Sequence, residues 1–387
     1  MSEEMINEAP IEAEEKPTTR LLSLDVYRGL IMLLLATNAF GLARALKGSD
    51  GALSKWIVFN TSHPEWNSQF GFVGVALWDL IQPAFMFIVG VSMPFSYEKR
   101  ARLGQGYGRR MGHAWTRALL LVLLGVFLQS LRRPETNWLF TNVLSQIGLG
   151  YGFLFFLVGR TFRTQFIVGG AILIGYYIAM VALPRGLESF AAHFENGTTF
   201  PQHFDLWFLN QFPREKPFTG HSYSTLNFVP SIVTMLMGLM SGQLLKNKEL
   251  GEYTKIKRLV VAAAACLVIG AIAGVTICPV VKKLWTPSWA LYSGGYALGL
   301  LALCYWIIDV KGWKGWVFPF VIVGLNPLAM YLMGSMGRGG VTAAFERHLP
   351  DVWFEGAHGH VVSATLMAAL FWLILLWMYR NRIFLRI

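Results

Sequence analysis

Two ionisable residues in the first quarter of the chain are the strongest candidates for chemistry. Asp79 stands at the start of an apolar run, where a carboxylate is energetically costly and usually functional. The alternative is a carboxylate at a helix N-terminus that is stabilised only by the helix dipole. His63 precedes Asp79 in a polar segment, and histidine is the side chain that titrates near neutral pH. Because a carboxylate can orient an imidazole, we expect Asp79 either to orient His63 or to hold a ligand hydroxyl.

Several amide side chains form a second group of candidates. Amide groups can donate hydrogen bonds to a reacting carbonyl oxygen or to ligand hydroxyls. Within apolar segments they equally often bond a neighbouring helix, and both interpretations stay open here. The residues are Asn38, Asn67, Gln146 and Asn326.

Basic residues near the ends of apolar runs could bind a phosphate group, for which Arg and Lys are the natural partners. The glycine-rich stretch 104–108 nearby is flexible enough to approach a phosphate, although it matches no known nucleotide-binding motif. Positive charge at such places also serves membrane orientation, so each residue has two interpretations. The candidates are Arg28, Arg109, Arg110, Arg117, Lys257 and Arg258.

The elements that position these residues are predicted to be membrane-spanning helices. The 387 residues are 54% hydrophobic and only 14% charged, whereas soluble proteins are about 25% charged. A span needs about 20 apolar residues. Ten such runs predict an all-α, polytopic helical bundle with about ten transmembrane helices: 29–46, 73–95, 116–131, 139–158, 165–184, 228–245, 259–279, 289–308, 317–336 and 361–379.

The distribution of basic residues predicts the orientation. About two thirds of the 33 lysines and arginines fall on one side if the N-terminus is cytoplasmic, which is the positive-inside pattern. Both termini are then inside, and the long segments 47–72, 185–227 and 337–360 are external loops. The polar, acidic residues 1–20 are expected to form a disordered cytoplasmic tail, and 21–387 a single transmembrane domain.

Charge and cysteine usage exclude two other classes of function. The net charge of +11 comes from basic residues clustered between apolar runs, so we expect no nucleic-acid partner. Cys266, Cys278 and Cys304 lie in or beside apolar segments without metal-ligand spacing, so neither a metal site nor a disulfide is expected.

Three motifs in residues 22–96 resemble the heparan-α-glucosaminide N-acetyltransferase family, the lysosomal transmembrane enzyme and its bacterial relatives. They are the S-L-D-x-x-R-G opening at residues 23–29, the H-x-x-W-N segment at 63–67, and the D-L-x-x-P-x-F-x-F-I-x-G-x-S helix at 79–92. Weaker similarities follow at 145–148, 230–242 and 324–331, so the resemblance covers nearly the whole chain from residue 20.

This resemblance implies transfer of acetyl from cytoplasmic acetyl-CoA to the amine of glucosamine, or of a glucosamine-containing saccharide, on the external side. His63 would be the base or an acetyl-carrying nucleophile, with Asp79 and Asn38 as catalytic partners. Acceptor binding would fall to Trp66, Asn67, Gln146 and Asn326, and acetyl-CoA binding to Arg28, Arg109, Arg110, Arg117 and Arg258. The expected partners are acetyl-CoA, an amino sugar and membrane lipid, with a homodimer as an option, in a bacterial inner membrane.

Some features depart from the family pattern and leave alternatives open. His221-Ser222-Tyr223-Ser224 stands where many bacterial relatives carry D-P-E-G, which puts the acceptor in doubt. The alternatives are an O-acyltransferase for an envelope polysaccharide, since the same base can activate a hydroxyl, and a sugar transporter without chemistry. A transporter would favour internal repeats, which the sequence does not show.

Overall fold

The chain folds into helices joined by turns, as the computed structural model shows for residues 21–63, 75–184, 186–187, 189–220 and 223–385. No strand occurs within those ranges, so the predicted all-α class is confirmed. The α-helices are α1 (Leu22–Thr37), α2 (Leu42–Ala45), α3 (Ala52–Asn60), α4 (Ile81–Arg102), α5 (Tyr107–Ser130), α6 (Val143–Phe155), α7 (Phe162–Ala182), α8 (Phe200–Phe208), α9 (Phe228–Lys246), α10 (Glu252–Thr276), α11 (Pro287–Cys304), α12 (Phe318–Leu325), α13 (Pro327–Leu332), α14 (Arg338–His348) and α15 (Gly356–Arg380).

Short 3₁₀ and π segments join or extend these helices. The 3₁₀ turns are η1 (Ala39–Gly41), η2 (Leu77–Leu80), η3 (Ala191–Phe194), η4 (Leu209–Gln211), η5 (Thr225–Asn227), η6 (Lys282–Leu284) and η9 (Asp351–Trp353). The π segments are η7 (Tyr305–Val310) and η8 (Met333–Gly337). Residues 1–20, predicted as a tail, lie outside the described residues.

Each of the ten predicted apolar runs coincides with a helix, but fewer than ten helices are long enough to cross a membrane. In the described ranges seven helices qualify by length and composition, and two sharply bent pairs raise the number to nine. The remaining run, 139–158, forms α6, whose 13 residues extend only about 20 Å. The expected ten spans are therefore corrected to between seven and nine, in a polytopic helical membrane protein.

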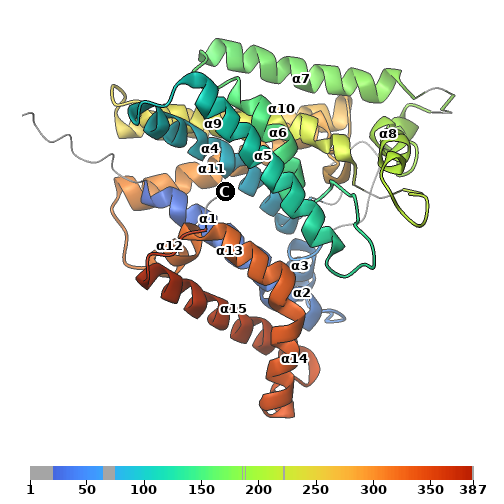
Figure 1. Ribbon diagram of the computed structural model, residues 1–387, viewed down its shortest axis with the longest axis vertical. Coiled ribbons are helices and arrows are strands. Elements are labelled where there is room, and N and C mark those ends of the chain that lie inside the picture. The colour runs from blue at the N-terminus through green and yellow to red at the C-terminus, as the bar shows by residue number, and fades with distance from the viewer. Residues whose placement is uncertain (1–20, 64–74, 185, 188, 221–222, 386–387) are drawn as a thin grey trace, which may run out of the picture.

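The three segments predicted as long loops contain helices of their own. Segment 47–72 holds α3, segment 185–227 holds α8, and segment 337–360 holds α14. In Figure 1, α7 runs along one margin of the molecule and α14 and α15 along the opposite one, while α4, α9 and α11 lie between them. The central helices are correspondingly the more buried ones, and α7 and α10 expose more apolar surface.

The first and ninth predicted spans are broken within the bundle. Beyond α1 the chain bends by 50°. Asn38, Ala39 and Phe40 all have positive φ there, a conformation that costs non-glycine residues energy. Arg338 stabilises the break by donating to the Leu35 and Ala36 carbonyls, at 3.2 and 2.8 Å.

The second break separates α12 from α13 at an angle of 84°. Pro327 begins α13, and a proline cannot donate the backbone hydrogen bond that would continue α12. The residue before a proline is also driven out of the helical region, and Asn326 has φ −127° and ψ 54°. The Gly and Pro content of this run therefore divides it into two helices.

Glycines bring two helix pairs into backbone contact at the centre of the bundle. On the α4–α9 interface, a Cβ on Gly90 would lie 1.8 Å from the Met235 carbonyl oxygen, and one on Gly238 would lie 2.0 Å from the Phe87 carbonyl oxygen. The α1–α12 interface repeats the arrangement with its own pair of glycines, Gly29 and Gly324. Small residues are the usual means of close helix approach in membranes, where van der Waals packing replaces the hydrophobic drive.

Candidate functional site

His63 and Asp79 form a hydrogen-bonded pair, as the sequence predicted. The Nδ1 atom of His63 lies 2.7 Å from Oδ1 of Asp79. The carboxylate side chain is only 6% exposed, whereas the imidazole is 47% exposed. Because a carboxylate accepts, Nδ1 carries the proton, and Nε2 of the neutral ring is left as the basic nitrogen. Nε2 has no hydrogen-bond partner in the described part of the chain, so it can accept a proton from a ligand.

The end of α3 places His63 beside η2. The Thr61 and Ser62 hydroxyls donate to the carbonyls of Ile57 and Val58, which closes the last turn of α3 just before His63. The side-chain Oδ1 of Asn60 then accepts from the backbone N–H of Leu77 at 3.3 Å, tying α3 to the segment that carries Asp79. The predicted loop histidine is therefore held at a helix end.

A third charged group, Lys282, shares the same carboxylate. Its Nζ lies 3.0 Å from Oδ1 of Asp79 and 3.4 Å from Nδ1 of His63. The lysine side chain is 9% exposed, and its burial lowers the pKa of the ammonium while Asp79 opposes that shift. Tyr223 completes the group with its ring centroid 5.9 Å from Nζ, and burial raises the pKa of its phenol. We call His63, Asp79, Lys282 and Tyr223 the histidine cluster.

A pocket lies at the opposite end of α4. It is a shallow pocket between α4, α5 and α6 that opens to solvent, and its enclosed volume is about 20 Å³. That space admits little more than a water molecule, so most of a larger ligand would lie outside it. Its lining residues are Met93, Ser96, Tyr97, Arg100, Arg110, His113, Ala114, Tyr151 and Phe155. With a rise of 1.5 Å per residue, the pocket lies about 20–30 Å along α4 from Asp79.

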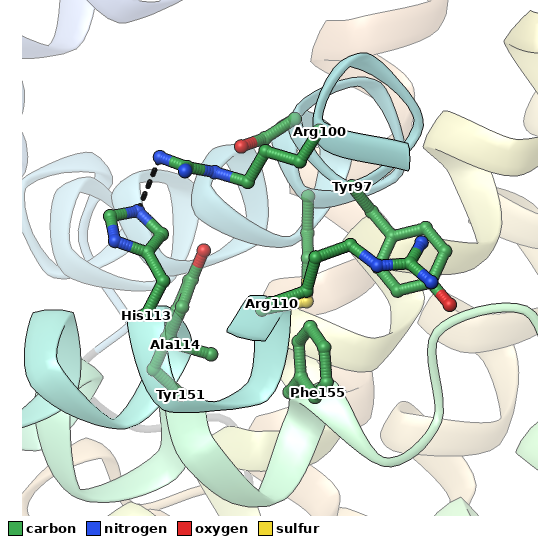
Figure 2. A pocket seen from close by; sticks show the side chains of 9 residues that line it. Tyr97, Arg100, Arg110, His113, Ala114, Tyr151 and Phe155 are labelled. Carbon is green, nitrogen blue, oxygen red and sulfur yellow. Dashed lines mark hydrogen bonds between the residues drawn. The ribbon is translucent and has the colours of Figure 1, made fainter. Parts of the chain in front are cut away.

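Positive charge dominates this pocket, as Figure 2 shows. Arg100 donates to Nε2 of His113 at 2.5 Å, and the guanidinium of Arg110 stacks 4.1 Å from the Tyr97 ring centroid. Arg117 lies beside the pocket and donates to the Tyr151 hydroxyl at 3.1 Å. No carboxylate comes within ion-pair distance of these three arginines in the ranges that the structure describes.

Two of these cations also have unused donors. The Nε atoms of Arg110 and Arg117 are buried without a hydrogen-bond partner among the described residues. Buried donors are normally satisfied, so they indicate a missing acceptor. Guanidinium groups match phosphate in both charge and geometry, and the pocket is therefore chemically suited to an anion such as a phosphate. We call it the arginine pocket.

The five arginines that the sequence assigned to a cofactor separate into two groups. Arg110 lines the arginine pocket and Arg117 borders it, while Arg28 donates to the Ser92 hydroxyl, one helical turn from the pocket residue Ser96. Arg109 and Arg258 are exposed and line no part of this pocket. The neighbouring Lys257 is exposed too and does not line it either.

The amides that were expected to bind the acceptor have structural partners. Gln146 is 1% exposed, and its Nε2 donates to the carbonyls of Phe140, Ser224 and Thr225. It thereby fixes the segment that follows Tyr223. Asp205 of α8 assists by accepting from the Thr225 backbone N–H at 2.8 Å. Its Oε1 is buried without a hydrogen-bond partner among the described residues, and the substrate contact expected of Gln146 stays a prediction.

Asn326 also holds backbone, at the other end of the molecule. Its Nδ2 donates to the Ile383 carbonyl at 2.9 Å, and its Oδ1 accepts from the Leu385 N–H at 3.0 Å. The structure therefore ties it to the C-terminal segment and does not bring it to His63. Asn38 lies at the α1 break, and within the described ranges its amide makes no side-chain hydrogen bond. Trp66 and Asn67 lie outside the described residues.

Three site residues were not identified from the sequence. Lys282 had been counted only as an external charge, and it meets Asp79 from 203 positions away. Arg100 and His113 stand in the basic internal segment, where orientation already explained positive charge. The nearest available signal was the grouping of Arg100, Arg110 and Arg117 with aromatic residues on adjacent helices.

No metal centre is evident in the part of the chain that is described. No group of three or more His, Cys, Asp or Glu side chains comes together there that could hold an ion. The three cysteines are free thiols, and two of them are buried.

Comparison with known proteins gives a distant relationship. No family model matches the chain. It is similar to the heparan-alpha-glucosaminide N-acetyltransferases of Homo sapiens and Mus musculus, with 22% identity over alignments that are 449 positions long, gaps included, in both cases. The alignments cover 98% of this chain but only 63% of each relative's length. The chain is thus related, distantly and over nearly its whole length, to this N-acetyltransferase.

Proposed function

We propose that the chain is a membrane-bound transferase that moves acetyl from cytoplasmic acetyl-CoA to the amine of glucosamine or a glucosamine-containing saccharide on the external side. The observation that carries the proposal is the His63–Asp79 hydrogen bond of 2.7 Å, which leaves Nε2 as a half-exposed base. The distant N-acetyltransferase relatives support the same reaction class. A bacterial inner membrane is the proposed location.

The chemistry requires one proton acceptor. The neutral amine attacks the thioester carbonyl carbon, and Nε2 of His63 takes the proton that the nitrogen must lose. The C–S bond then breaks, and the CoA thiolate leaves and takes up a proton. Asp79 stabilises the imidazolium formed during the step, because Nδ1–H already donates to it. Trp66 and Asn67, which follow His63 in sequence, are proposed to contact the acceptor.

The arginine pocket would hold the phosphates of CoA. Arg100, Arg110 and Arg117 supply charge without a carboxylate partner in the described ranges, and two of them carry unused Nε donors. The phosphates and the thioester would then lie at opposite ends of α4, about 20–30 Å apart. Because the enclosed part of the pocket is small, most of CoA would lie outside it and would extend along the helix.

Acetyl transfer by purified protein tests the proposal. Wild type should acetylate glucosamine with acetyl-CoA, and His63→Ala should be slower by the roughly 10²–10⁴-fold that a general base supplies. CoA binding should remain, because the arginine pocket lies at the other end of α4. His193→Ala serves as the control, since His193 is another partly exposed histidine of a predicted external segment. Near-normal turnover by folded His63→Ala would remove His63 from the mechanism.

The sidedness has a separate test. Cysteines introduced at the exposed Ser49 and Ser189 should react with an impermeant thiol reagent added to intact cells. Wild type gives the background, because Cys278 and Cys304 are buried. If neither introduced cysteine reacted, the proposed orientation in the membrane would be wrong.

Incubation with acetyl-CoA alone separates the two possible routes. If His63 carries the acetyl group, labelled acetyl should appear on the protein before any acceptor is added, with ping-pong kinetics. If His63 acts only as a base, label should transfer solely when glucosamine is present.

A further inference from the structure

The contacts of Lys282 imply a role beyond ion pairing. Its Nζ lies 3.0 Å from the same Asp79 oxygen that accepts from His63, and 3.4 Å from the imidazole itself. Both Asp79 and Lys282 are more than nine-tenths buried, so water screens their charges little. The electrostatic potential at His63 therefore depends on the carboxylate and the ammonium together.

The turn that carries Lys282 is anchored by side chains from three other elements. Tyr176 of α7 donates to the Leu284 carbonyl at 3.1 Å, and the Asn227 amide of η5 donates to the Lys283 carbonyl at 2.8 Å. The indole of Trp285 donates to the Thr234 hydroxyl of α9 at 3.3 Å. Such anchoring restricts the backbone of η6, so Lys282 is presented to Asp79 from a fixed position.

Thr286 fixes the same turn from within. Its hydroxyl donates to the Pro279 carbonyl at 2.8 Å and accepts from the Val281 backbone N–H at 3.1 Å. The Ser288 hydroxyl donates to the same Pro279 carbonyl. Trp285 adopts φ 49°, a conformation that costs a non-glycine residue energy and persists only where surrounding contacts impose it.

A histidine that acts as a base near neutral pH must be correctly oriented, and one of its ring nitrogens must be unprotonated. A carboxylate next to an imidazole orients it but also favours its protonated form. An adjacent ammonium opposes that second effect and leaves the first unchanged. The groups facing His63 from the packed elements are Asp79 on η2, Lys282 on η6 and Tyr223 before η5, with Lys283 one residue further along.

We propose that Lys282 is a positioning residue whose ammonium offsets the Asp79 carboxylate, so that Asp79 orients His63 without holding a second proton on its ring. This inference rests on the proposed function, since it takes His63 to be a base. Its test does not require acetyl transfer, so the two can fail separately.

The reaction of His63 with diethyl pyrocarbonate is the direct readout, because this reagent acylates an imidazole only when the ring is neutral. Modification of the His63 peptide is followed by mass spectrometry from pH 5 to 8.5 in the full-length protein. In Lys282→Met the midpoint should move up by about one pH unit or more, as expected for an uncompensated carboxylate within hydrogen-bond distance. In Lys282→Arg, which keeps the charge, it should stay near the wild-type value.

Two further variants keep the test decisive if Lys282→Met is poorly folded. Asp79→Asn should move the midpoint down, and Asp79→Asn combined with Lys282→Met should return it close to wild type. Lys55→Met, an exposed lysine on the same predicted side, is the charge-matched control and should leave it unchanged. The acidic limb of kcat/KM for acetyl transfer should shift in the same directions.

Three results would overturn the proposal. The first is an unchanged midpoint in folded Lys282→Met, and the second is a shifted midpoint in the double variant. The third is an equal shift in Lys282→Arg and Lys282→Met, which would show that the shape of the lysine matters and its charge does not.

Discussion

Removing one member of the buried Asp79–Lys282 pair should destabilise the fold more than removing both. At 3.0 Å and an effective dielectric constant of about 20, the attraction is about 5 kcal/mol before desolvation is subtracted. A buried charge that loses its partner costs about 3–5 kcal/mol, whereas replacing both charges with neutral groups is often close to neutral. Lys282→Met and Asp79→Asn should each lower the free energy of unfolding by that amount.

If the double variant is close to wild type, it should be about 6–10 kcal/mol more stable than the sum of the single changes implies. The assay is reversible unfolding of the purified protein in mixed micelles, with all four proteins of the cycle measured in identical detergent. Raising the salt to 1 M should leave the coupling largely intact, because both side chains are more than nine-tenths buried. Additive effects within about 0.5 kcal/mol would show that the two charges do not interact, and the argument would fail.

Three other predictions concern the arginine pocket, α8 and the α4–α9 interface. Arg110→Ala should raise the KM for acetyl-CoA about tenfold, since a charge-assisted contact is lost, whereas the exposed neighbour change Arg109→Ala should not. Burial raises the pKa of Asp205 to about 6, so the folded state keeps a proton that the unfolded state has released. The free energy of unfolding should therefore fall by up to about 3 kcal/mol as pH rises from about 4 through 6. Asp205→Asn should remove this contribution to the pH dependence of thermal unfolding. Gly238→Ala should lower the melting temperature, because its Cβ would lie 2.0 Å from a carbonyl oxygen.

Each of these has a result that contradicts it. Equal KM values for the two arginine variants would place the phosphates elsewhere. If wild type and Asp205→Asn showed the same dependence of stability on pH between 4 and 6, Asp205 would not have a raised pKa in the fold. A melting temperature for Gly238→Ala equal to that of an exposed glycine change such as Gly175→Ala would mean that α4 and α9 can separate at little cost.

The sequence predicted the helices because membrane insertion leaves a strong one-dimensional signal. Every apolar run became a helix, since backbone groups in lipid must be satisfied within the segment. The breaks were harder to foresee. Pro327 gave a local reason for one of them, but the bend after Asn38 depends on Arg338, which reaches the end of α1 from 302 residues away. A run of residues cannot reveal a cap that arrives from another helix.

The site followed the same division. The pairing of His63 with Asp79 could be inferred because both lie in one short stretch. Lys282 could not, since a lysine between spans has an adequate explanation in membrane orientation and its partner is fixed only by packing. Gln146 and Asn326 show another limit of the sequence. It could not reveal that the amides of both residues donate to backbone carbonyls of the chain itself, and their contact with a ligand stays a prediction.

The glycine contacts between α4 and α9 make the spacing between the two ends of α4 a fixed length. Because the two backbones touch at Gly90 and Gly238, α4 cannot slide or tilt against α9 without a collision. The helix therefore sets a fixed distance between the histidine cluster and the arginine pocket. Under the proposed function, an acyl donor would be selected by its length as well as by its charged groups. A shortened thioester that lacks the nucleotide would then reach the histidine cluster without reaching the arginine pocket.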